Sequence, residues 1–480
     1  MSTVQLQNYI AGEWIAGATT SKDVNPSDTG DVIAEYAQAD KAQTERAVEA
    51  ARAAFPAWAT YNVQARADLL DKVGNEIIAR KEELGRLLSR EEGKTLAEGI
   101  GEVVRAGNVF KFFGGEVLRR TGELVPSVRP GIDVELTREP VGVVGIIAPW
   151  NFPAAIPAWK IAPALAYGNC VVFKPADLVP GMAHAIAKIL IDAGVPKGVF
   201  NFVMGRGSVV GEVLVNDPRV DAITFTGSVE TGRQVAAKAI ARMAKFQLEM
   251  GGKNPLVVLD DADLKVAVEC AVNGAFFSTG QRCTASSRLI VTKGIHDKFV
   301  AALVERLKGV KVDNALKQGT DIGPVVDKNQ LNQDLFYIDA AKKEGGKLAF
   351  GGNLIKRETD GFYLEPALFT ETLNTMRINR EEVFGPVASV VAVNNYDEAL
   401  AVANDTPFGL SSGIVTTSLK HASHFRKNAQ AGMVMVNLPT AGVDYHVPFG
   451  GRKGSSYGPR EQGRYAVEFF TTVKTSYVLA

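Results

Sequence analysis

The sequence has few of the residues that usually carry reactive chemistry. Its 480 residues include only 3 Cys and 5 His. Three cysteines are too few for a disulfide framework, and the Cys and His never stand at the spacing of a zinc site, so we expect no metal. Any cysteine chemistry must therefore depend on one thiol in a reducing compartment.

Net charge and long apolar segments are also lacking. The 53 Lys and Arg balance the 53 Asp and Glu, which argues against nucleic acid or a membrane surface as the main partner. The longest apolar stretches, such as residues 141–148, are too short to span a bilayer. Because the N-terminal segment lacks the basic and apolar regions of a signal peptide, we expect a cytoplasmic protein.

The composition that is present is typical of a globular protein. The chain is 46% apolar and 22% charged, and its length predicts about two to four domains. Apolar residues at helical spacing, such as Val48, Ala51 and Phe55, predict helices in the first third.

Short apolar segments then alternate with helical patterns. We predict strands at residues 143–148, 170–174, 199–204, 222–226 and 246–249, each closed by a Pro or Gly within two residues. This alternation predicts an α/β fold with a doubly wound parallel sheet. A second α/β series between residues 256 and 437 predicts another domain, and outlying strands at 134–137 and 465–478 are expected to pair as a small arm.

Two glycine-bearing turns in successive strand–helix units suggest a phosphate site. Gly207 and Gly211 follow the third strand, with the wrong spacing for a GxGxxG fingerprint, and Gly227 and Ser228 follow the fourth. Free backbone N–H groups and the helix dipole favour a phosphate at such turns. Each turn alone is also compatible with an ordinary strand–helix connection.

Cys283, in the segment GQRCTA, is the candidate nucleophile. A free thiol with a pKa near about 8.5 is only a few per cent thiolate at neutral pH, so it needs a cationic or dipolar neighbour, and Arg282 is a candidate. The alternative is a buried structural cysteine, which is our interpretation of Cys170 and Cys270.

A carboxylate and an amide are candidates for the supporting roles, because no His falls in a motif. Glu249 ends an apolar strand, where burial would raise its pKa toward the range of a general base. Asn151 follows another strand, where open α/β sheets place ligands, and its amide can donate to an oxyanion. The alternatives are a solvent-exposed Glu and a rigid aromatic–proline turn.

Seven motifs in order along the whole chain carry a family resemblance: PWNFP, FKPA, FTGS, LEMGGKNP, GQRCTA, EEVFGP and PFGGRK. The chain resembles the NAD(P)-dependent aldehyde dehydrogenase superfamily. This resemblance implies an aldehyde-dehydrogenase-like fold. It comprises a Rossmann-type cofactor domain (1–119 and 141–251), an α/β catalytic domain (252–455) and a small β oligomerisation arm (120–140 and 465–480). It also implies a homodimer or homotetramer.

The resemblance implies a catalytic role for three residues. Cys283 would attack the aldehyde to give a thiohemiacetal, and the Asn151 amide would hold the oxyanion together with the Cys283 N–H. Glu249 would activate the water that hydrolyses the thioester. Because CoA-acylating members lack a Glu at this position, the expected enzyme is non-acylating. A non-catalytic homologue would be expected to have lost one of these residues, and all three are present.

The implied cofactor is NAD, with NADP possible. Lys174 would bind the adenine ribose, and a carboxylate at Asp177 would accept from the ribose 2′-OH and repel a 2′-phosphate. Asp is shorter than the Glu of many NAD-preferring members, so NADP use stays open. The full implied set is Trp150, Lys174, Asp177, Gly207, Gly211, Gly227 and Ser228 (the pyrophosphate turn), and Glu382 and Phe384 (the nicotinamide ribose).

The whole C-terminal stretch, in which residues 439–449 are expected to form the pocket rim, resembles that of the α-ketoglutaric semialdehyde (2,5-dioxopentanoate) dehydrogenases of sugar-acid catabolism. The implied reaction oxidises 2,5-dioxopentanoate to 2-oxoglutarate. Arg282 either pairs with a distal carboxylate of the substrate or only tunes the thiolate. Trp159 stands where several succinate-semialdehyde-type relatives carry Arg, which removes one expected carboxylate anchor and counts against plain succinate semialdehyde. Trp159 and Phe449 instead suggest an apolar wall. The alternatives are a succinate semialdehyde or a broad or aromatic aldehyde dehydrogenase. The implied substrate residues are Phe152, Trp159, Arg282 and Phe449.

Overall fold

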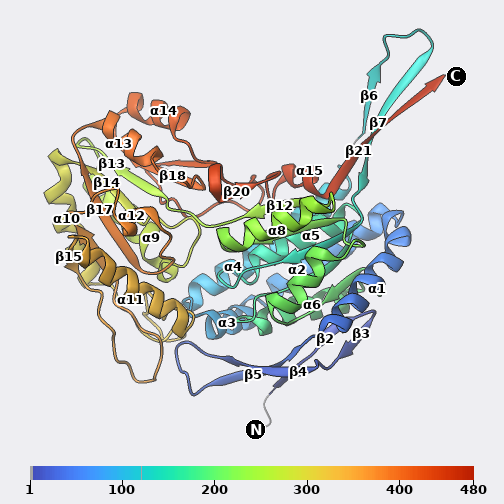
Figure 1. The fold of residues 1–480 in the computed structure, drawn as a ribbon, viewed down its shortest axis with the longest axis horizontal. Helices are drawn as coiled ribbons and strands as arrows, with labels where there is room; N and C mark the ends of the chain where they lie inside the picture. The colour runs from blue at the N-terminus through green and yellow to red at the C-terminus, as the bar shows by residue number, and fades with distance from the viewer. Residues whose placement is uncertain (1–3, 120–121, 480) are drawn as a thin grey trace.

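The computed structural model describes residues 4–119 and 122–479. Two α/β blocks lie side by side, and a β arm projects from one of them (Figure 1). The expected cofactor domain begins at residue 1, and the expected arm begins at residue 120 and ends at residue 480. These ends lie outside the described residues. The division into domains at the expected boundaries stays a prediction.

The first block is built on a sheet with the strand order β20-β12-β11-β8-β9-β10-β2-β3. Its central strands, β12 to β10 in that order, are parallel, which confirms the predicted doubly wound sheet. The order reverses at β8, whose neighbours are β9 and β11, and this is where such sheets bind ligands. The bounds are β8 Val143–Ile147, β9 Cys170–Lys174, β10 Phe200–Phe202, β11 Ala222–Thr226, β12 Lys245–Glu249 and β20 Ser456–Tyr457.

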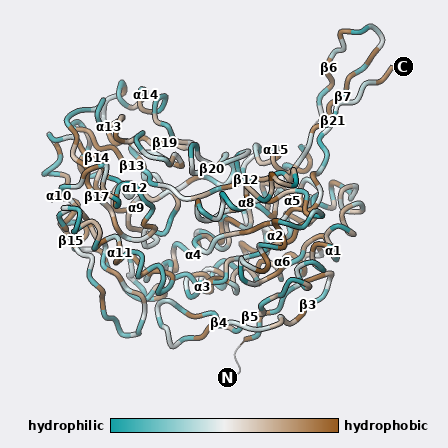
Figure 2. Tube along the Cα trace, in the orientation of Figure 1, coloured by the Kyte–Doolittle hydropathy of each residue, from teal (hydrophilic) through white to brown (hydrophobic). Residues whose placement is uncertain are grey.

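Helices cover this sheet, as its fully buried strands require. Every residue of β9 is buried, and so is every residue of α5. Figure 2 shows hydrophobic residues along inner elements such as α5 and hydrophilic ones along outer helices such as α14 (Leu419–Asn428). The bounds are α1 Lys41–Ala59, α2 Val63–Ala79, α3 Lys81–Glu92, α4 Leu96–Val117, α5 Ala155–Ala166, α6 Pro180–Ala193, the π-helix η1 Gly207–Gly211, α7 Glu212–Asn216 and α8 Val229–Ala241.

Between Val4 and Gln38 the chain forms five short strands, which were not predicted from the sequence. β2 and β3 form a hairpin on the edge of the first sheet, and its turn places Ala11 at φ 57° and Gly12 at φ 90°. Two successive positive φ angles suit the turns that join twisted strands. Ala at the first of them is not the Asn or Asp that usually signals such a turn. The bounds are β1 Val4–Leu6, β2 Asn8–Ile10, β3 Glu13–Ile15, β4 Thr19–Val24 and β5 Val32–Gln38.

The second block contains the second predicted α/β series. Its sheet has the order β15-β16-β17-β14-β13-β18-β19, and all pairs except β15–β16 are parallel. The strands are β13 Pro255–Val258, β14 Arg288–Thr292, β15 Lys347–Phe350, β16 Ala367–Thr370, β17 Val387–Val393, β18 Ser411–Val415 and β19 Met433–Val436. The helices are α9 Leu264–Ala275, η2 Phe277–Gly280, α10 Lys293–Lys308, α11 Lys328–Lys343, α12 Arg377–Arg380, α13 Tyr396–Asn404 and α14, followed by η3 Lys453–Ser455.

The predicted outlying strands pair with each other in the arm. β7 (Ile132–Pro140) lies between β6 (Glu123–Pro126) and β21 (Thr471–Leu479), antiparallel to both. The prediction that the last strand begins at Tyr465 is wrong: η4 (Arg464–Ala466) and α15 (Val467–Phe470) precede it because Phe469 and Phe470 are buried in the first core. Among the described residues, no helix is both long and apolar enough to cross a membrane.

Candidate active site

Several of the chemistry-bearing residues predicted from sequence lie at one edge of the first sheet. Asn151 follows β8, Gly227 follows the neighbouring strand β11, and Glu249 ends β12 beyond it. Because these strands are parallel, their carboxyl ends meet at the same edge, as expected for a doubly wound sheet.

Cys283 lies where two cavities meet. One cavity of about 400 Å³ is lined by residues that include Phe152, Trp159, Arg282 and Phe449, and we call it the aldehyde-side cavity. The other, of about 240 Å³, is the cofactor-side cavity. Its lining includes Trp150, Asn151, Gly227, Ser228, Glu382 and Phe384. Cys283 lines both, so a single thiol can be reached from two sides.

The loop that carries Cys283 has an unusual backbone. Ser278 and Thr279 have φ angles of 51° and 57°, which non-glycine residues rarely adopt. Gly280 follows at φ 66°, and a Cβ there would lie 2.1 Å from the Gly385 oxygen. The Ser278 N–H and hydroxyl both donate to Glu98 Oε1, at 2.9 and 2.8 Å. Strain held by such contacts is typical of functional sites.

The surroundings of Cys283 favour its neutral thiol in the free protein. Burial raises the pKa of Cys283 to about 12, and the Glu382 and Glu249 carboxyls add to the effect, while the N–H groups of Cys283 and Thr284 lower it. Asn254 fixes the peptide by donating to the Cys283 carbonyl at 2.8 Å. Formation of a thiolate therefore needs additional stabilisation or a proton acceptor.

Asn151 is buried and held from both sides. Its Nδ2 donates to the Gln281 carbonyl at 3.0 Å, and Lys94 Nζ donates to the Asn151 carbonyl at 2.7 Å. The Lys94 ammonium also pairs with Glu102 at 2.8 Å and is 1% exposed. A primary amide carries a second N–H, which is the one that a developing oxyanion would use.

Glu249 is buried, as the sequence analysis expected, but it lines neither cavity. Its Oε2 accepts from the Ser456 hydroxyl at 2.5 Å, and its side chain packs against Gly450. Burial, with a contribution from the Glu461 carboxyl, raises its pKa well above the usual range. Because Glu249 in turn raises the pKa of Cys283, the two groups are electrostatically coupled even though this conformer points to Ser456.

The cofactor-side cavity has polar groups that suit a dinucleotide. Thr226 Oγ1 is buried without a hydrogen-bond partner among the described residues. Ser228 is the N-cap residue of α8. The backbone N–H groups at the start of a helix favour an anion such as a phosphate. Glu382 accepts from the Gly252 N–H at 2.8 Å, and burial raises its pKa to about 7. The rings of Phe384 and Trp150 pack edge to face, 5.5 Å apart.

The other predicted cofactor residues lie along the same edge but outside this cavity. Lys174 ends β9, and its Nζ donates to Pro175 O at 2.7 Å and pairs with Asp177 at 3.3 Å. Gly207 opens η1 after β10 with no atom within 4 Å of the place of a Cβ, so the backbone there is open to approach. Gly211 ends the same π-helix.

All four predicted substrate residues line the aldehyde-side cavity. The rings of Trp159 and Phe449 are stacked 5.3 Å apart and form the expected apolar wall. The Lys94 ammonium lies 4.0 Å from the centre of the Phe152 ring. Arg282 is engaged elsewhere: its Nη2 pairs with Glu98 at 3.1 Å and donates to Ser278 Oγ at 2.8 Å.

The helical layer brings further charged residues to this cavity, and these were not among the site residues predicted from sequence. Lys94 precedes α4, and Glu98, Glu102 and Arg105 lie on it. The spacing of four and then three residues places those three on one helix face, a signal that was readable. Nothing local to this helix, however, indicates that its charged face packs against a loop nearly two hundred residues away.

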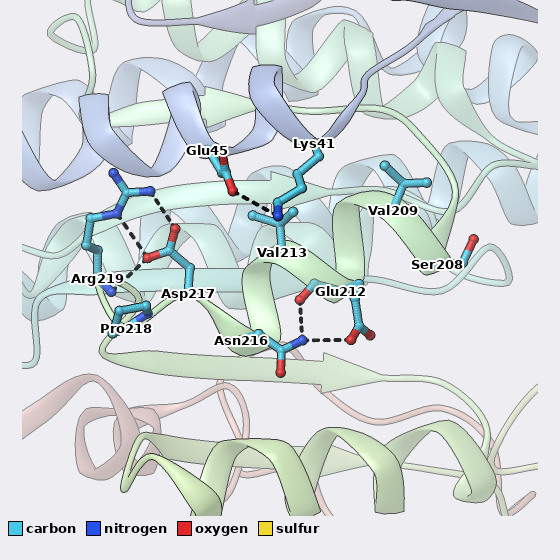
Figure 3. A pocket seen from close by; sticks show the side chains of 10 residues that line it. All are labelled: Lys41, Glu45, Ser208, Val209, Glu212, Val213, Asn216, Asp217, Pro218 and Arg219. Carbon is cyan, nitrogen blue, oxygen red and sulfur yellow. Dashed lines mark hydrogen bonds and ion pairs between the residues drawn. The ribbon is translucent and has the colours of Figure 1, made fainter.

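A larger cavity of about 810 Å³ lies between α1 and the segment that contains η1 and α7 (Figure 3). Lys41 pairs with Glu45 at 3.7 Å, and Arg219 pairs with Asp217 at 2.6 Å. Asn216 donates to the Glu212 carboxylate at 2.8 Å. These charges are already paired with one another, and none of the predicted site residues lines this cavity.

Comparison with known proteins agrees with this arrangement. The aldehyde dehydrogenase family model matches residues 14–476. The alpha-ketoglutaric semialdehyde dehydrogenase of Bacillus subtilis is 43% identical, over 98% of this chain and 97% of that protein. The 2,5-dioxopentanoate dehydrogenase of Saccharolobus solfataricus is 41% identical, over 98% of both.

A solved structure shows the same fold. The crystal structure of betaine aldehyde dehydrogenase from Staphylococcus aureus in complex with NAD+ has a TM-score of 0.96 and 36% identity, covering 99% of this chain and 95% of that chain. The predicted aldehyde-dehydrogenase-like fold is thereby confirmed. This chain belongs to the aldehyde dehydrogenase family.

Proposed function

We propose that this protein oxidises 2,5-dioxopentanoate to 2-oxoglutarate with NAD+, through a covalent intermediate on Cys283. The observation that carries the proposal is the place of Cys283, at the junction of an aldehyde-side and a cofactor-side cavity. A thiol there can bond to an aldehyde in one cavity while a hydride acceptor lies in the other. Membership of the aldehyde dehydrogenase family supports the reaction class.

In the first step, the Cys283 sulfur attacks the aldehyde carbon and the carbonyl oxygen becomes negative. The Asn151 amide and the Cys283 N–H donate to that oxygen and stabilise it. Lys94 positions Asn151 through its bond to the Asn151 carbonyl. Because the thiol has a raised pKa, its proton must pass to solvent water as the sulfur attacks.

The cofactor-side residues fit NAD+, which the Staphylococcus aureus relative binds. When bound, it supplies the acceptor for the hydride that leaves the thiohemiacetal carbon, so that Cys283 then carries a thioester. We propose that Gly227 and Ser228 receive the pyrophosphate, that Glu382 and Phe384 hold the nicotinamide ribose, and that Lys174 holds the adenine ribose. Asp177, beside Lys174, supports a preference for NAD+ over NADP+. Trp150, Gly207 and Gly211 complete the proposed cofactor set.

Glu249 is proposed to activate the water that hydrolyses the thioester. Burial raises the pKa of Glu249, so the carboxylate, once its proton has left, is a stronger base for this step. For this step, the side chain turns from Ser456 toward Cys283. Hydrolysis releases the carboxylate product and returns the free thiol.

The substrate assignment rests on two relatives named for α-ketoglutaric semialdehyde and 2,5-dioxopentanoate. We expect the highest kcat/KM for 2,5-dioxopentanoate with NAD+, followed by succinate semialdehyde, and lower values for benzaldehyde and betaine aldehyde. The measurement is NADH or NADPH formation for each aldehyde with each cofactor. Equal values for benzaldehyde and the semialdehydes would contradict the substrate assignment, whereas no oxidation of any aldehyde would contradict the reaction itself.

Removal of the Asn151 amide tests the oxyanion role. In Asn151→Ala we expect kcat to fall about 10²- to 10³-fold, the usual effect of losing one oxyanion donor, with little change in KM. Steady-state kinetics measure this, and the rate of Cys283 alkylation by iodoacetamide is the control for an intact loop. A fall in alkylation parallel to the fall in kcat would point to a structural role instead.

We also propose that the arm joins two copies of the chain in a homodimer or homotetramer. Its strands expose apolar side chains that a monomer would leave in water, including Leu124 at 84%, Tyr477 at 61% and Leu479 at 75% exposure. The free thiols of the chain support a reducing compartment, and we propose the cytoplasm.

A further inference from the structure

Two arginines, Arg105 and Arg282, line the aldehyde-side cavity. They differ in whether a carboxylate of the chain already pairs with the guanidinium. Arg282 is matched by Glu98 at 3.1 Å, and its Nη1 faces the Asn273 carbonyl at 3.3 Å. The same Glu98 carboxylate holds Ser278, in the strained loop before Cys283. Arg282 and Glu98 therefore form a neutral pair that supports the loop, and the positive charge is largely compensated before any substrate arrives.

Arg105, on α4, has no such partner. Its Nη2 donates to the neutral Gln462 side chain at 3.2 Å, and its Nε is buried without a hydrogen-bond partner within the described part of the chain. No described carboxylate lies within ion-pair distance of its guanidinium. A half-buried guanidinium without a carboxylate is unfavourable unless a ligand completes it.

The two acidic residues near Arg105 do not neutralise it. Glu102 lies on the same helix, but its Oε2 binds Lys94 at 2.8 Å and its Oε1 accepts from the Ala154 and Ala155 N–H groups. Asp444 lies in the exposed segment above the cavity and makes no ion pair with Arg105. The guanidinium is thus the uncompensated cation of the cavity wall.

We propose that Arg105 binds the distal carboxylate of the substrate and so selects anionic semialdehydes. The proposal rests on the oxidation of an aldehyde at Cys283 proposed above, and it names the substrate class of that site. Arg105 and Cys283 line the same cavity of about 400 Å³, which a short chain with an aldehyde at one end and a carboxylate at the other can span. A planar guanidinium can hold a carboxylate by two parallel hydrogen bonds.

The place of Arg105 also excludes cationic aldehydes. Its guanidinium carbon lies 5.4 Å from the centre of the Trp159 ring, on the aromatic face that a quaternary ammonium group would otherwise use. A second cation there would meet like charge. Arg105 therefore separates this chain from a site for betaine aldehyde, although the fold is shared with such an enzyme.

The test compares Arg105→Met with wild type on 2,5-dioxopentanoate and on pentanal, a neutral aldehyde of the same carbon number. We expect the ratio of kcat/KM for the anionic to the neutral aldehyde to fall about 30-fold or more, mainly through KM, because a buried charge pair loses one partner. Arg105→Lys should keep part of the preference, since it retains the charge but not the planar fork. Glutarate should inhibit pentanal oxidation by wild type and lose that effect in Arg105→Met.

Arg282→Met is the matched control. Because it breaks the support of the Cys283 loop, it should lower kcat/KM for both aldehydes by similar factors and leave their ratio within about threefold. An unchanged ratio in Arg105→Met, or a selective loss in Arg282→Met instead, would overturn the proposal. If wild type oxidises pentanal but shows no preference for the anion, the carboxylate anchor is refuted and the dehydrogenase reaction stands. If wild type oxidises neither aldehyde, the proposed function itself fails.

Discussion

Cys283→Ala is expected to abolish aldehyde oxidation, with a loss of about 10⁴-fold or more in kcat, the scale seen when an enzyme loses its nucleophile. The reason is that Cys283 is the one nucleophilic side chain, among the described residues, that lines both cavities. NADH formation measures the loss. Binding of NAD+ should persist, because the proposed cofactor contacts lie on other residues.

Cys270→Ala is the control for this variant. It removes a thiol that is buried on α9, whose pKa burial raises to about 11. We expect Cys270→Ala to retain activity. Comparable losses in both variants would show that the thiol at position 283 acts through packing rather than chemistry.

Alkylation gives the pH dependence of the same thiol. A pKa raised to about 12 means that the thiol form dominates near neutral pH and that the thiolate fraction grows as the pH rises. In the protein without cofactor, the rate of alkylation by iodoacetamide should rise about tenfold per pH unit from about pH 7 to about pH 10 without a plateau. A plateau below about pH 8 would show that the thiolate is stabilised in the free protein.

Glu249→Gln is expected to separate the two halves of the reaction. A glutamine cannot accept the proton of the hydrolytic water, so the thioester should accumulate. We expect a burst of NADH close to one equivalent per subunit, followed by turnover about 10²- to 10⁴-fold slower than wild type. Rapid-mixing absorbance measures the burst, and loss of the burst itself would place Glu249 in the first step instead.

Burial of the Glu249 carboxyl should also make the stability of the folded protein depend on pH. Because burial raises the pKa of Glu249, its protonated form is favoured in the folded state, and the folded protein loses stability as the pH rises above about 4.5, the usual value. Glu249→Gln carries no such charge, so its melting temperature should exceed that of wild type at neutral pH and match it at low pH. Glu269→Gln, which removes an exposed carboxylate on α9, is the control for both predictions. It should show neither the NADH burst nor the change in melting temperature.

The sequence by itself determined the core of the first sheet. The strands at Cys170–Lys174 and Ala222–Thr226 have the predicted bounds, because each is a short apolar run closed by Pro or Gly. Such runs suit strands buried on both faces, and local composition is enough to recognise them. Of the first strands, β1, β3 and β4 were missed because their edge positions and mixed burial carry no comparable signal. The more buried strands β2 and β5 were missed as well.

The sequence also determined the candidates for the site. Asn151, Glu249 and Cys283 were identified by residue type and by their places at strand ends or beside a Gly-bearing turn. The parallel order of β8, β11 and β12 brings Asn151 and Glu249 to one sheet edge, whereas Cys283 comes from the loop after η2 in the second block. The small number of Cys and His residues does not limit the proposed chemistry, because one thiol, one amide and one carboxylate suffice for it.

Only the tertiary structure decided which charged side chains in the site pair with one another and which stay unpaired. Arg282 meets Glu98 across 184 positions of sequence, and Glu249 meets Ser456 across 207. Arg105 keeps its charge available because nearby Glu102 is taken by Lys94. Periodicity reports which face of a helix is polar but not which distant group lies opposite it. The electrostatic balance of a buried cavity depends on those opposite groups, since each charge there is stabilised or neutralised by its nearest partner.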